Sequence, residues 1–310
     1  MDRHNHDCII IGGGPAGLTA AVYAARARLD VIVLEGAITG GLVNSTYMVE
    51  NFPSYPGIHG MELMEKMRDH VDSLQVPVEE LCEIASLDLA GDLKIAATED
   101  AIYAAPAMIL ATGRTPIPLD VSAECEQVHY CSVCDGAAYA GKNVLVVGGG
   151  NSAFDESLYL LSLGVRHITL IEVMDRFFAA ECTQEVLQCR ENVSCLTNTE
   201  VQELVVEDGK LKAAILYNAC TGDEKEVPVD GVFVFLGQKP NNSLFEKQIT
   251  LDAHGYIPAG TDMRTSLPGV FAAGDIVAKP YRQIVTAVSD GAVAALEAER
   301  FIRARKLASG

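Results

Sequence analysis

The sequence predicts an α/β protein of two domains, each built on a parallel sheet. A strand, glycine turn, helix, strand pattern occurs twice, first in residues 8–35 and again in residues 143–172. Each copy ends in a glutamate, 23 residues after Gly12 in the first and 24 residues after Gly148 in the second. The length of 310 residues also exceeds that of an average single domain. Together these observations predict two Rossmann-like three-layer domains.

The first copy begins with the apolar run Cys-Ile-Ile-Ile at residues 8–11, which predicts a buried strand. Gly12, Gly14 and Gly17 follow with G-x-G-x-x-G spacing. The first glycine permits a tight turn, the second lets the backbone approach a pyrophosphate, and the third lets helix and strand pack closely. Glu35 ends the next strand, where an acid can accept hydrogen bonds from a ribose. We therefore expect a dinucleotide site here.

The second copy repeats these features after the apolar strand at residues 143–147. Gly148, Gly150 and Ala153 occupy the turn, and Glu172 closes the strand that follows the helix. Two complete units with matching spacing are much stronger evidence than one glycine motif. Each turn leads into a helix N-terminus, which favours an anion, so the sequence predicts two bound cofactors.

A pair of cysteines, Cys131 and Cys134, lies just before the second copy and is followed by Asp135. The spacing fits a redox couple, but also a structural disulfide or, with Cys125 and His129, a zinc site. A reducing compartment disfavours structural disulfides. The remaining cysteines are interpreted as buried small hydrophobic residues: Cys8, Cys82, Cys182, Cys189, Cys195 and Cys220.

The charge balance excludes several classes of function. Forty-two acidic residues against 23 basic ones give a formal net charge of −19. Such a chain repels nucleic acid and anionic membranes, so neither is expected as a partner. The N-terminus lacks the basic start and apolar run of a secretory signal, which favours a cytoplasmic protein.

The C-terminal stretch from Leu267 to Ile302 predicts a short strand, a loop and a long amphipathic helix. It resembles the flavin-contacting C-terminal motif of flavoproteins with two dinucleotide sites. This resemblance implies that the last segment completes the first domain and that the second domain is inserted. We place the FAD-binding domain at 1–115 and 245–310 and the inserted domain at 116–244. Loops rich in Gly, Pro and Asn mark the crossings and suggest a hinge.

Seven motifs in this order resemble those of bacterial-type, low-molecular-weight thioredoxin reductases: GGGPAGL, VENFP, ATG, CSVCDG, GGGNSA, GVFAAGD and YRQ. The resemblance extends over essentially the whole chain. It implies an FAD-dependent thiol–disulfide oxidoreductase that acts as a homodimer and reduces thioredoxin or a thioredoxin-like protein. It also favours the redox interpretation of the cysteines, with Cys134 facing the flavin, Cys131 attacking the partner and Asp135 supplying a proton.

The same resemblance assigns residues to the two cofactors, and no residue to a metal. The positions expected to bind FAD are Gly12, Gly14, Pro15, Ala16, Gly17, Glu35, Gly40, Gly41, Leu42, Asn51, Ala111, Thr112, Gly113, Gly274, Asp275, Arg282, Gln283 and Ile284. The positions expected to bind a pyridine nucleotide are Gly148, Gly150, Asn151, Ser152, Ala153 and Glu172.

The second site departs from the NADPH-dependent members of that family. Where they place a histidine and three arginines around the 2′-phosphate, this sequence has Glu172, Val173, Met174 and Phe178. A carboxylate accepts hydrogen bonds from free ribose hydroxyls and repels a phosphate. We therefore predict NADH rather than NADPH as the donor. A ferredoxin-type donor is the alternative, followed by a flavin-bound redox sensor without turnover.

The partner side also departs from the family. Two phenylalanines that commonly follow the cysteine motif are replaced by Ala137 and Ala138. Because those phenylalanines are associated with thioredoxin docking, we expect an unusual thioredoxin or a glutaredoxin-like partner.

Overall fold

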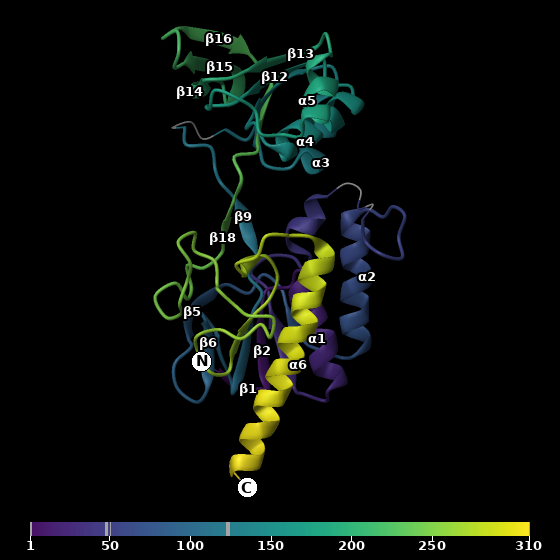
Figure 1. Cartoon of the computed structure of the whole chain (residues 1–310), viewed down its shortest axis with the longest axis vertical. Helices are drawn as coiled ribbons and strands as arrows, with labels where there is room; N and C mark the ends of the chain where they lie inside the picture. The colour runs from purple at the N-terminus through teal and green to yellow at the C-terminus, as the bar shows by residue number, and fades with distance from the viewer. Residues whose placement is uncertain (1, 47–48, 50, 122–124, 310) are drawn as a thin grey trace. The chain divides into compact units, whose positions relative to one another are not determined.

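The computed structural model describes residues 2–46, 49, 51–121 and 125–309, apart from the side chains of residues 133, 134, 308 and 309. The chain forms two compact units (Figure 1). Unit 1 combines Met1–Thr115 with Lys239–Gly310, and unit 2 is Pro116–Gln238. Within the described residues, no helix is both long and apolar enough to cross a membrane.

Unit 1 is built on a five-stranded parallel sheet with the order β19-β8-β2-β3-β4. Its strands are β2 (Cys8–Ile11), β3 (Val31–Leu34), β4 (Val78–Glu79), β8 (Ala107–Leu110) and β19 (Val270–Ala272). Every residue of β2, β3, β8 and β19 is buried. Continuous burial is typical of a parallel sheet that is covered on both faces, which explains why these strands are apolar without alternation.

Helices cover one face of this sheet and a second sheet covers the other. The helices α1 (Pro15–Arg26), α2 (Gly60–Ser73) and α6 (Ile284–Ser309) lie together, with α1 packed against both others (Figure 1). The second sheet has the order β1-β7-β6-β5, from β1 (Asp2–Asn5), β5 (Ile84–Asp88), β6 (Lys94–Thr98) and β7 (Ala101–Ala105). Ile10 belongs to the core on the helix side, and Ile9 to the core on the other side. The result is a three-layer unit.

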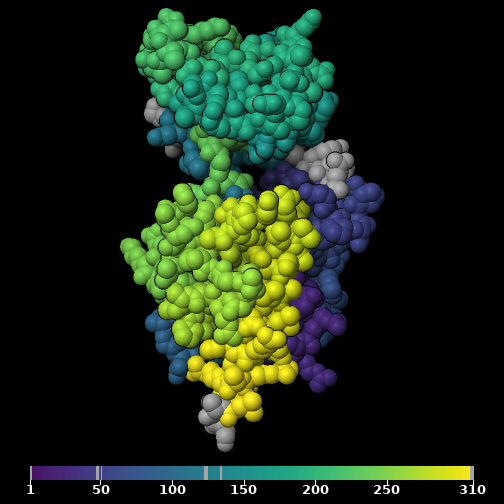
Figure 2. All heavy atoms as spheres, in the orientation of Figure 1, coloured from purple at the N-terminus to yellow at the C-terminus, as the bar shows by residue number. Residues whose placement is uncertain are grey.

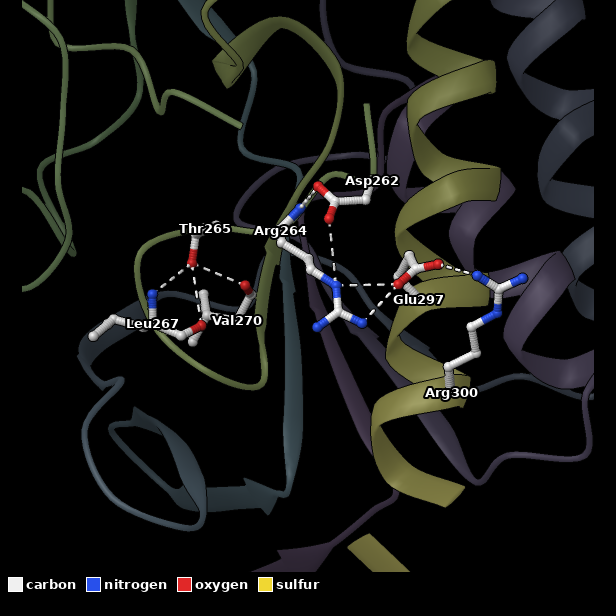
Figure 3. A network of polar contacts seen from close by, with 7 residues as sticks. All are labelled: Asp262, Arg264, Thr265, Leu267, Val270, Glu297 and Arg300. Carbon is white, nitrogen blue, oxygen red and sulfur yellow. Dashed lines mark hydrogen bonds and ion pairs between the residues drawn. The ribbon is translucent and has the colours of Figure 1, made fainter. Parts of the chain in front are cut away.

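The C-terminal segment completes unit 1. Strand β19 pairs in parallel with β8, and in the space-filling view the segment that includes α6 (yellow) covers one face of the unit (Figure 2). A polar network holds α6 to the chain just before β19 (Figure 3). Glu297 of α6 accepts hydrogen bonds from Nε and Nη2 of Arg264, at 3.1 and 2.7 Å, and from Nη1 of Arg300 at 2.6 Å. The helix therefore has a fixed position on the sheet.

Unit 2 has the same kind of architecture. Its parallel sheet has the order β10-β17-β11-β12-β13, with β10 (Val128–His129), β11 (Asn143–Val147), β12 (His167–Ile171), β13 (Val193–Leu196) and β17 (Gly231–Val234). The helices are α3 (Ser132–Asp135), α4 (Asn151–Ser162) and α5 (Glu181–Gln188). A three-stranded antiparallel sheet is formed by β14 (Thr199–Glu207), β15 (Lys210–Asn218) and β16 (Glu224–Pro228). Val146 belongs to the core with α4, whereas Leu145 belongs to the core with the antiparallel sheet.

The two connections between the units form a small sheet of their own. Strand β9 (Arg114–Pro116) pairs with β18 (Gln238–Pro240). The hydroxyl of Thr112 donates to the carbonyl of Asn241 at 2.7 Å, and the Asn241 amide donates to the Thr112 carbonyl at 2.8 Å. The return crossing is therefore at residues 238–239, before the position 244–245 that the sequence suggested. The physical reason is that residues 239–244 are tied to unit 1: Asn241 bonds to Thr112, and the Asn242 amide donates to the Gly255 carbonyl at 2.8 Å.

Candidate functional site

The first glycine turn has the shape that a dinucleotide phosphate needs. Gly12 has a φ of +106°, and a Cβ built on Gly17 would lie 1.8 Å from the Gly12 carbonyl oxygen. A Cβ on Gly14 would meet nothing within 4 Å. Gly14 also caps α1 without any side-chain hydrogen bond. The turn therefore leaves open space beside the N-terminus of α1, where an anion can bind.

Glu35 lies beside this turn and its carboxylate is held in place. Oε2 accepts a hydrogen bond from the Gly13 N–H at 2.5 Å, and Oε1 accepts one from the Ala37 N–H at 2.8 Å. The Gly13 carbonyl in turn accepts from the Gly40 N–H at 2.9 Å. The acid and the glycine turn thus form one rigid edge of unit 1, as a ribose and pyrophosphate site requires.

The second glycine turn repeats this geometry in unit 2. Gly148 has a φ of +127°, and a Cβ on Gly150, the residue before α4, would meet nothing within 4 Å. A Cβ built on Gly149 would lie 2.5 Å from Oε2 of Glu172, so this carboxylate lies against the turn as Glu35 does in unit 1. Its Oε1 accepts from the Met174 N–H at 2.9 Å.

The surroundings of Glu172 are apolar and exposed. Val173, Met174 and Phe178 have 53, 51 and 53% of their surface exposed. The only base in this short stretch is Arg176, whose guanidinium lies 5.4 Å from the centre of the Phe178 ring. The backbone N–H groups of Phe178 and Ala179 donate to the Gly149 carbonyl at 2.7 and 3.1 Å. The loop is therefore tied to the turn, and it presents a carboxylate with no cluster of cations.

Several of the other positions expected to bind FAD form two polar groups in unit 1. In the first, the side-chain amide of Asn51 donates from Nδ2 to Oε1 of the Gln283 side chain at 3.0 Å. Next to Gln283 in the chain, Arg282 stacks its guanidinium 4.2 Å from the centre of the Tyr256 ring. Its buried Nε has no hydrogen-bond partner among the described residues. An unpaired buried donor is costly, and a polar ligand atom would satisfy it.

The second group surrounds Asp275. Arg114 donates from Nη2 to Asp275 at 3.1 Å, and the Lys279 ammonium lies 3.9 Å from the same carboxylate. Lys279 also pairs with Asp290 at 2.6 Å, and Asp290 accepts from the Gly274 N–H at 3.2 Å. These contacts fix the turn after β19. Together with the open glycine turn and the unpaired Nε of Arg282, they fit a bound FAD in unit 1.

The other expected residues lie on the backbone that frames these groups. Pro15 and Ala16 open α1, Gly40 precedes the 3-10 helix Gly41–Ser45 that includes Leu42, Ala111 to Gly113 follow β8, and Ile284 begins α6. In unit 2, Asn151 and Ser152 open α4, and Ala153 is fully buried there.

The cysteine region lies in unit 2 at the start of α3. Cys131 is disulfide-bonded. The side chain of Cys134 lies outside the described residues, so its expected position toward the flavin stays a prediction. Cys8, Cys82, Cys125, Cys182, Cys189, Cys195 and Cys220 are free. Of these only Cys8 is fully buried, while Cys182, Cys189 and Cys220 are exposed, so the expectation of burial was wrong for these three.

Asp135 is part of a hydrogen-bonded chain that sequence reasoning missed. Its Oδ2 lies 3.1 Å from Nδ1 of His129, and Nε2 of His129 lies 2.7 Å from the Tyr139 hydroxyl. The sequence indicates His129 only as a candidate zinc ligand. Both of its ring nitrogens have partners here, and the described residues contain no group of three or more His, Cys, Asp or Glu arranged to hold a metal.

Comparison with known proteins places this arrangement in a family. Residues 6–291 match the pyridine nucleotide-disulphide oxidoreductase family. The chain belongs to this family.

Within the family, the oxidoreductase is similar to thioredoxin reductases along almost its full length. It is 39% identical over 303 residues to thioredoxin reductase of Mycolicibacterium smegmatis, covering 96% of each protein. It is 43% identical over 300 residues to a "34.2 kDa protein in rubredoxin operon" of Clostridium pasteurianum, covering 96% of this chain and 97% of that protein. The crystal structure of Lactococcus lactis thioredoxin reductase in its FR conformation matches with a TM-score of 0.87 and 35% identity, covering 96% of this chain and 99% of the other.

These findings confirm the fold class and the resemblance to bacterial-type, low-molecular-weight thioredoxin reductases. The protein is a flavoenzyme oxidoreductase of the thioredoxin-reductase type. Membership also supports a pyridine nucleotide as donor, without distinguishing NADH from NADPH.

Proposed function

We propose that this oxidoreductase takes electrons from NADH into FAD and uses the Cys131/Cys134 pair to reduce a disulfide of a thioredoxin-like protein. The observation that carries the choice of donor is the position of Glu172. Its carboxylate lies against the second glycine turn as Glu35 lies against the first, and each accepts a hydrogen bond from the N–H two residues further on. Two acids in one geometry support two ribose sites with free hydroxyls.

The same position disfavours NADPH. A 2′-phosphate would approach a carboxylate, and Val173 and Met174 beside it offer no charge in return. A charge-assisted hydrogen bond contributes about 1.5–3 kcal/mol, so the loss of several such contacts lowers affinity by orders of magnitude. NADH lacks that phosphate and avoids the penalty.

FAD, when bound in unit 1, supplies the two-electron chemistry that connects a hydride donor to a disulfide. The N-terminus of α1 would hold the pyrophosphate and Glu35 the adenosine ribose. Arg282 and Gln283 would approach the ring system, where the unpaired Nε of Arg282 supports a polar contact with the cofactor. The Lys279–Asp290 pair would keep the turn at Gly274 and Asp275 in place.

The cysteine pair would transfer the electrons onward. With both thiols reduced, the Cys131 thiolate attacks the partner disulfide, and Cys134 then displaces the partner, so that one disulfide forms as another breaks. Asp135 would give a proton to the leaving thiolate, and its partly exposed side chain supports that role. One pair cannot serve a buried flavin and a protein partner at once, so we also propose that unit 2 rotates about β9 and β18.

The relatives named thioredoxin reductase support a thioredoxin-like partner. Ala137 and Ala138 are exposed and small, which favours a partner with a more protruding surface than one that docks against aromatic side chains. A homodimer and a cytoplasmic location remain parts of this proposal.

A ferredoxin-type donor is the second candidate. It is favoured by the exposed apolar side chains of Val173, Met174 and Phe178, which replace the cations that a phosphate would need. A plant-type ferredoxin, at about −400 mV, is reducing enough for a dithiol near about −270 mV.

Anaerobic stopped-flow mixing separates these donors. We expect NADH to bleach the flavin absorbance quickly, and NADPH at equal concentration to do so at least about tenfold more slowly. Fast bleaching by NADPH would contradict the role given to Glu172, and bleaching by reduced ferredoxin alone would establish the second candidate. A protein that no donor can drive through steady-state disulfide reduction would be a flavin-bound redox sensor instead.

A matched pair of variants tests the residue itself. Glu172→Ala should weaken NADH binding, whereas Glu226→Gln, an exposed charge change on β16, should leave it unchanged. Equal NADH affinity in both variants would refute the ribose contact.

A further inference from the structure

The chain Asp135–His129–Tyr139 runs from the surface of unit 2 into its core. The Asp135 side chain is 39% exposed and that of His129 is 14% exposed. Tyr139 is buried, with only 5% of its surface exposed. The imidazole therefore connects an accessible acid, next to Cys134 in sequence, with a hydroxyl that solvent does not reach.

The imidazole is held in one orientation. His129 pairs with Phe233 across β10 and β17, and its ring centre lies 5.2 Å from that of Phe233 and 5.3 Å from that of Tyr139. Tyr139 and Phe233 also meet edge to face, 5.4 Å apart. A Cβ on Gly231 would run into the Tyr139 ring, so only glycine leaves room for this cluster.

The groups around the imidazole leave each of its ring nitrogens facing an oxygen, from Asp135 at Nδ1 and from Tyr139 at Nε2. Among the residues that the structure describes, Asp135 is the ionisable group paired with Nδ1. Burial first, and then the nearby Asp135, Cys125 and Asp230, raise the pKa of Tyr139 to about 12. Tyr139 thus remains neutral, and its oxygen can accept a hydrogen bond from a protonated Nε2. The Lys142 ammonium lies 5.0 Å from the centre of the Tyr139 ring.

We infer that His129 is a positioning residue for the disulfide chemistry, which orients Asp135 and returns to it the proton that it gives to a leaving sulfur. The inference rests on the proposed disulfide reduction. Protonated Asp135 gives its proton to the partner thiolate, which leaves a carboxylate and a neutral thiol. The Nδ1 proton of the His129 imidazolium then passes to Asp135, and solvent protonates the neutral imidazole again. No electrons move in these steps, because thiol–disulfide exchange alone carries the electron pair.

The test uses the FAD-loaded full chain, reduced beforehand with dithionite so that the identity of the natural donor does not matter. Two small disulfides serve as probes. Bis(2-hydroxyethyl) disulfide releases a basic alkyl thiolate that needs a proton, whereas 5,5′-dithiobis(2-nitrobenzoate) releases a weakly basic aryl thiolate that does not. Rates are measured from pH 5.5 to pH 9 for the wild type, His129→Asn and Tyr139→Phe. An exposed histidine in unit 1 provides the control, His254→Asn.

We expect His129→Asn to slow the alkyl disulfide reaction by about tenfold near pH 6 and by less above pH 8, because histidine side chains in general exchange a proton within this range and asparagine does not. The aryl disulfide reaction should be unchanged. Asparagine can still donate to Asp135 but cannot titrate, so this difference separates proton return from simple orientation. Tyr139→Phe keeps the ring and should give a smaller loss with the same dependence on the leaving thiol.

The possible outcomes distinguish the two levels of the argument. A reduced wild type that reduces neither probe would overturn the proposed function and this inference with it. A wild type that reduces both, with His129→Asn equal to it at every pH, would overturn the inference alone. A deficit that is equal for both disulfides and constant with pH would also overturn it, since that pattern indicates only a structural role. If His129→Asn does not fold by its melting temperature, the same comparison on Tyr139→Phe decides.

Discussion

The donor preference can be changed by design, because the loop after Glu172 is exposed. The double substitution Glu172→Gln with Val173→Arg removes the negative charge and introduces a positive one. The glutamine carbonyl can still accept the hydrogen bond that Met174 N–H gives to Oε1 at 2.9 Å, so the loop keeps its anchor. Val173 is 53% exposed, which leaves an arginine free to reach a phosphate without disturbing the core.

The size of the effect follows from the contacts exchanged. One charge-assisted hydrogen bond to the 2′-phosphate contributes about 1.5–3 kcal/mol, which corresponds to roughly 10- to 150-fold in affinity. Removal of the like charge at Glu172 adds to this gain. NADH loses a charge-assisted contact to its ribose and should bind about tenfold more weakly.

The assay is anaerobic stopped-flow bleaching of the flavin across a range of NADH and NADPH concentrations, from which Kd is obtained for each nucleotide. The single substitutions and Glu226→Gln serve as controls. The gain for NADPH should shrink at high salt, because exposed charges are screened. A double variant with the wild-type ratio of NADPH to NADH affinity would refute the placement of a ribose at Glu172.

Three further predictions concern FAD, the dithiol and the C-terminal helix. Gly17→Ala should reduce the amount of FAD that the protein binds, measured from the visible spectrum. A Cβ 1.8 Å from the Gly12 carbonyl oxygen must displace the turn, at a cost of about 1–3 kcal/mol. Full FAD occupancy in this variant would contradict the close packing. Cys131→Ser should keep FAD and lose disulfide reduction. The control Cys220→Ser, at an exposed free cysteine, should retain both. Stoichiometric zinc in the wild type that is lost from Cys131→Ser would instead support the metal interpretation. Glu297→Gln should destabilise unit 1 by roughly 1 kcal/mol at pH 7 in urea unfolding, with Glu246→Gln as control. Hydrogen bonds from Arg264, and then the charges of Arg300 and Arg264, lower the pKa of Glu297. The stabilising effect of Glu297 is therefore complete above the usual carboxyl pKa and disappears as the pH falls through the lowered pKa. If the variant is still less stable than the wild type at pH 3, the charge of Glu297 is not responsible.

The sequence predicts the parts of this protein that depend on local backbone geometry. Gly12 and Gly148 could be recognised because only glycine tolerates their positive φ, and Glu35 and Glu172 because each ends a strand at a fixed spacing from its turn. The first strand of the unit 1 sheet was predictable from composition, because four consecutive apolar residues at 8–11 favour a strand that is buried on both faces.

Long-range pairings could not be predicted in this way. The return crossing depends on β9 pairing with β18, and neither three-residue segment has a recognisable pattern of its own. His129 acquires its aromatic neighbour Phe233 only because β17, about a hundred residues further along the chain, pairs with β10. Lys279 likewise lacks a sequence signal for its contact with Asp290, because both residues look like ordinary surface charges until the turn at Gly274 brings them together.

The paired strands β9 and β18 make the inserted unit a removable module. The Asn241 N–H donates to the Gly113 carbonyl at 3.1 Å, so the two chain ends that flank the insertion are only a hydrogen bond apart. A short turn could join them in place of unit 2 with little loop-closure entropy, and the sheet and cores of unit 1 would lose no strand. The same junction could accept a different catalytic domain. Replacing the coding segment for unit 2 between these two strands would therefore give the FAD-binding unit a different redox partner without changing its own fold.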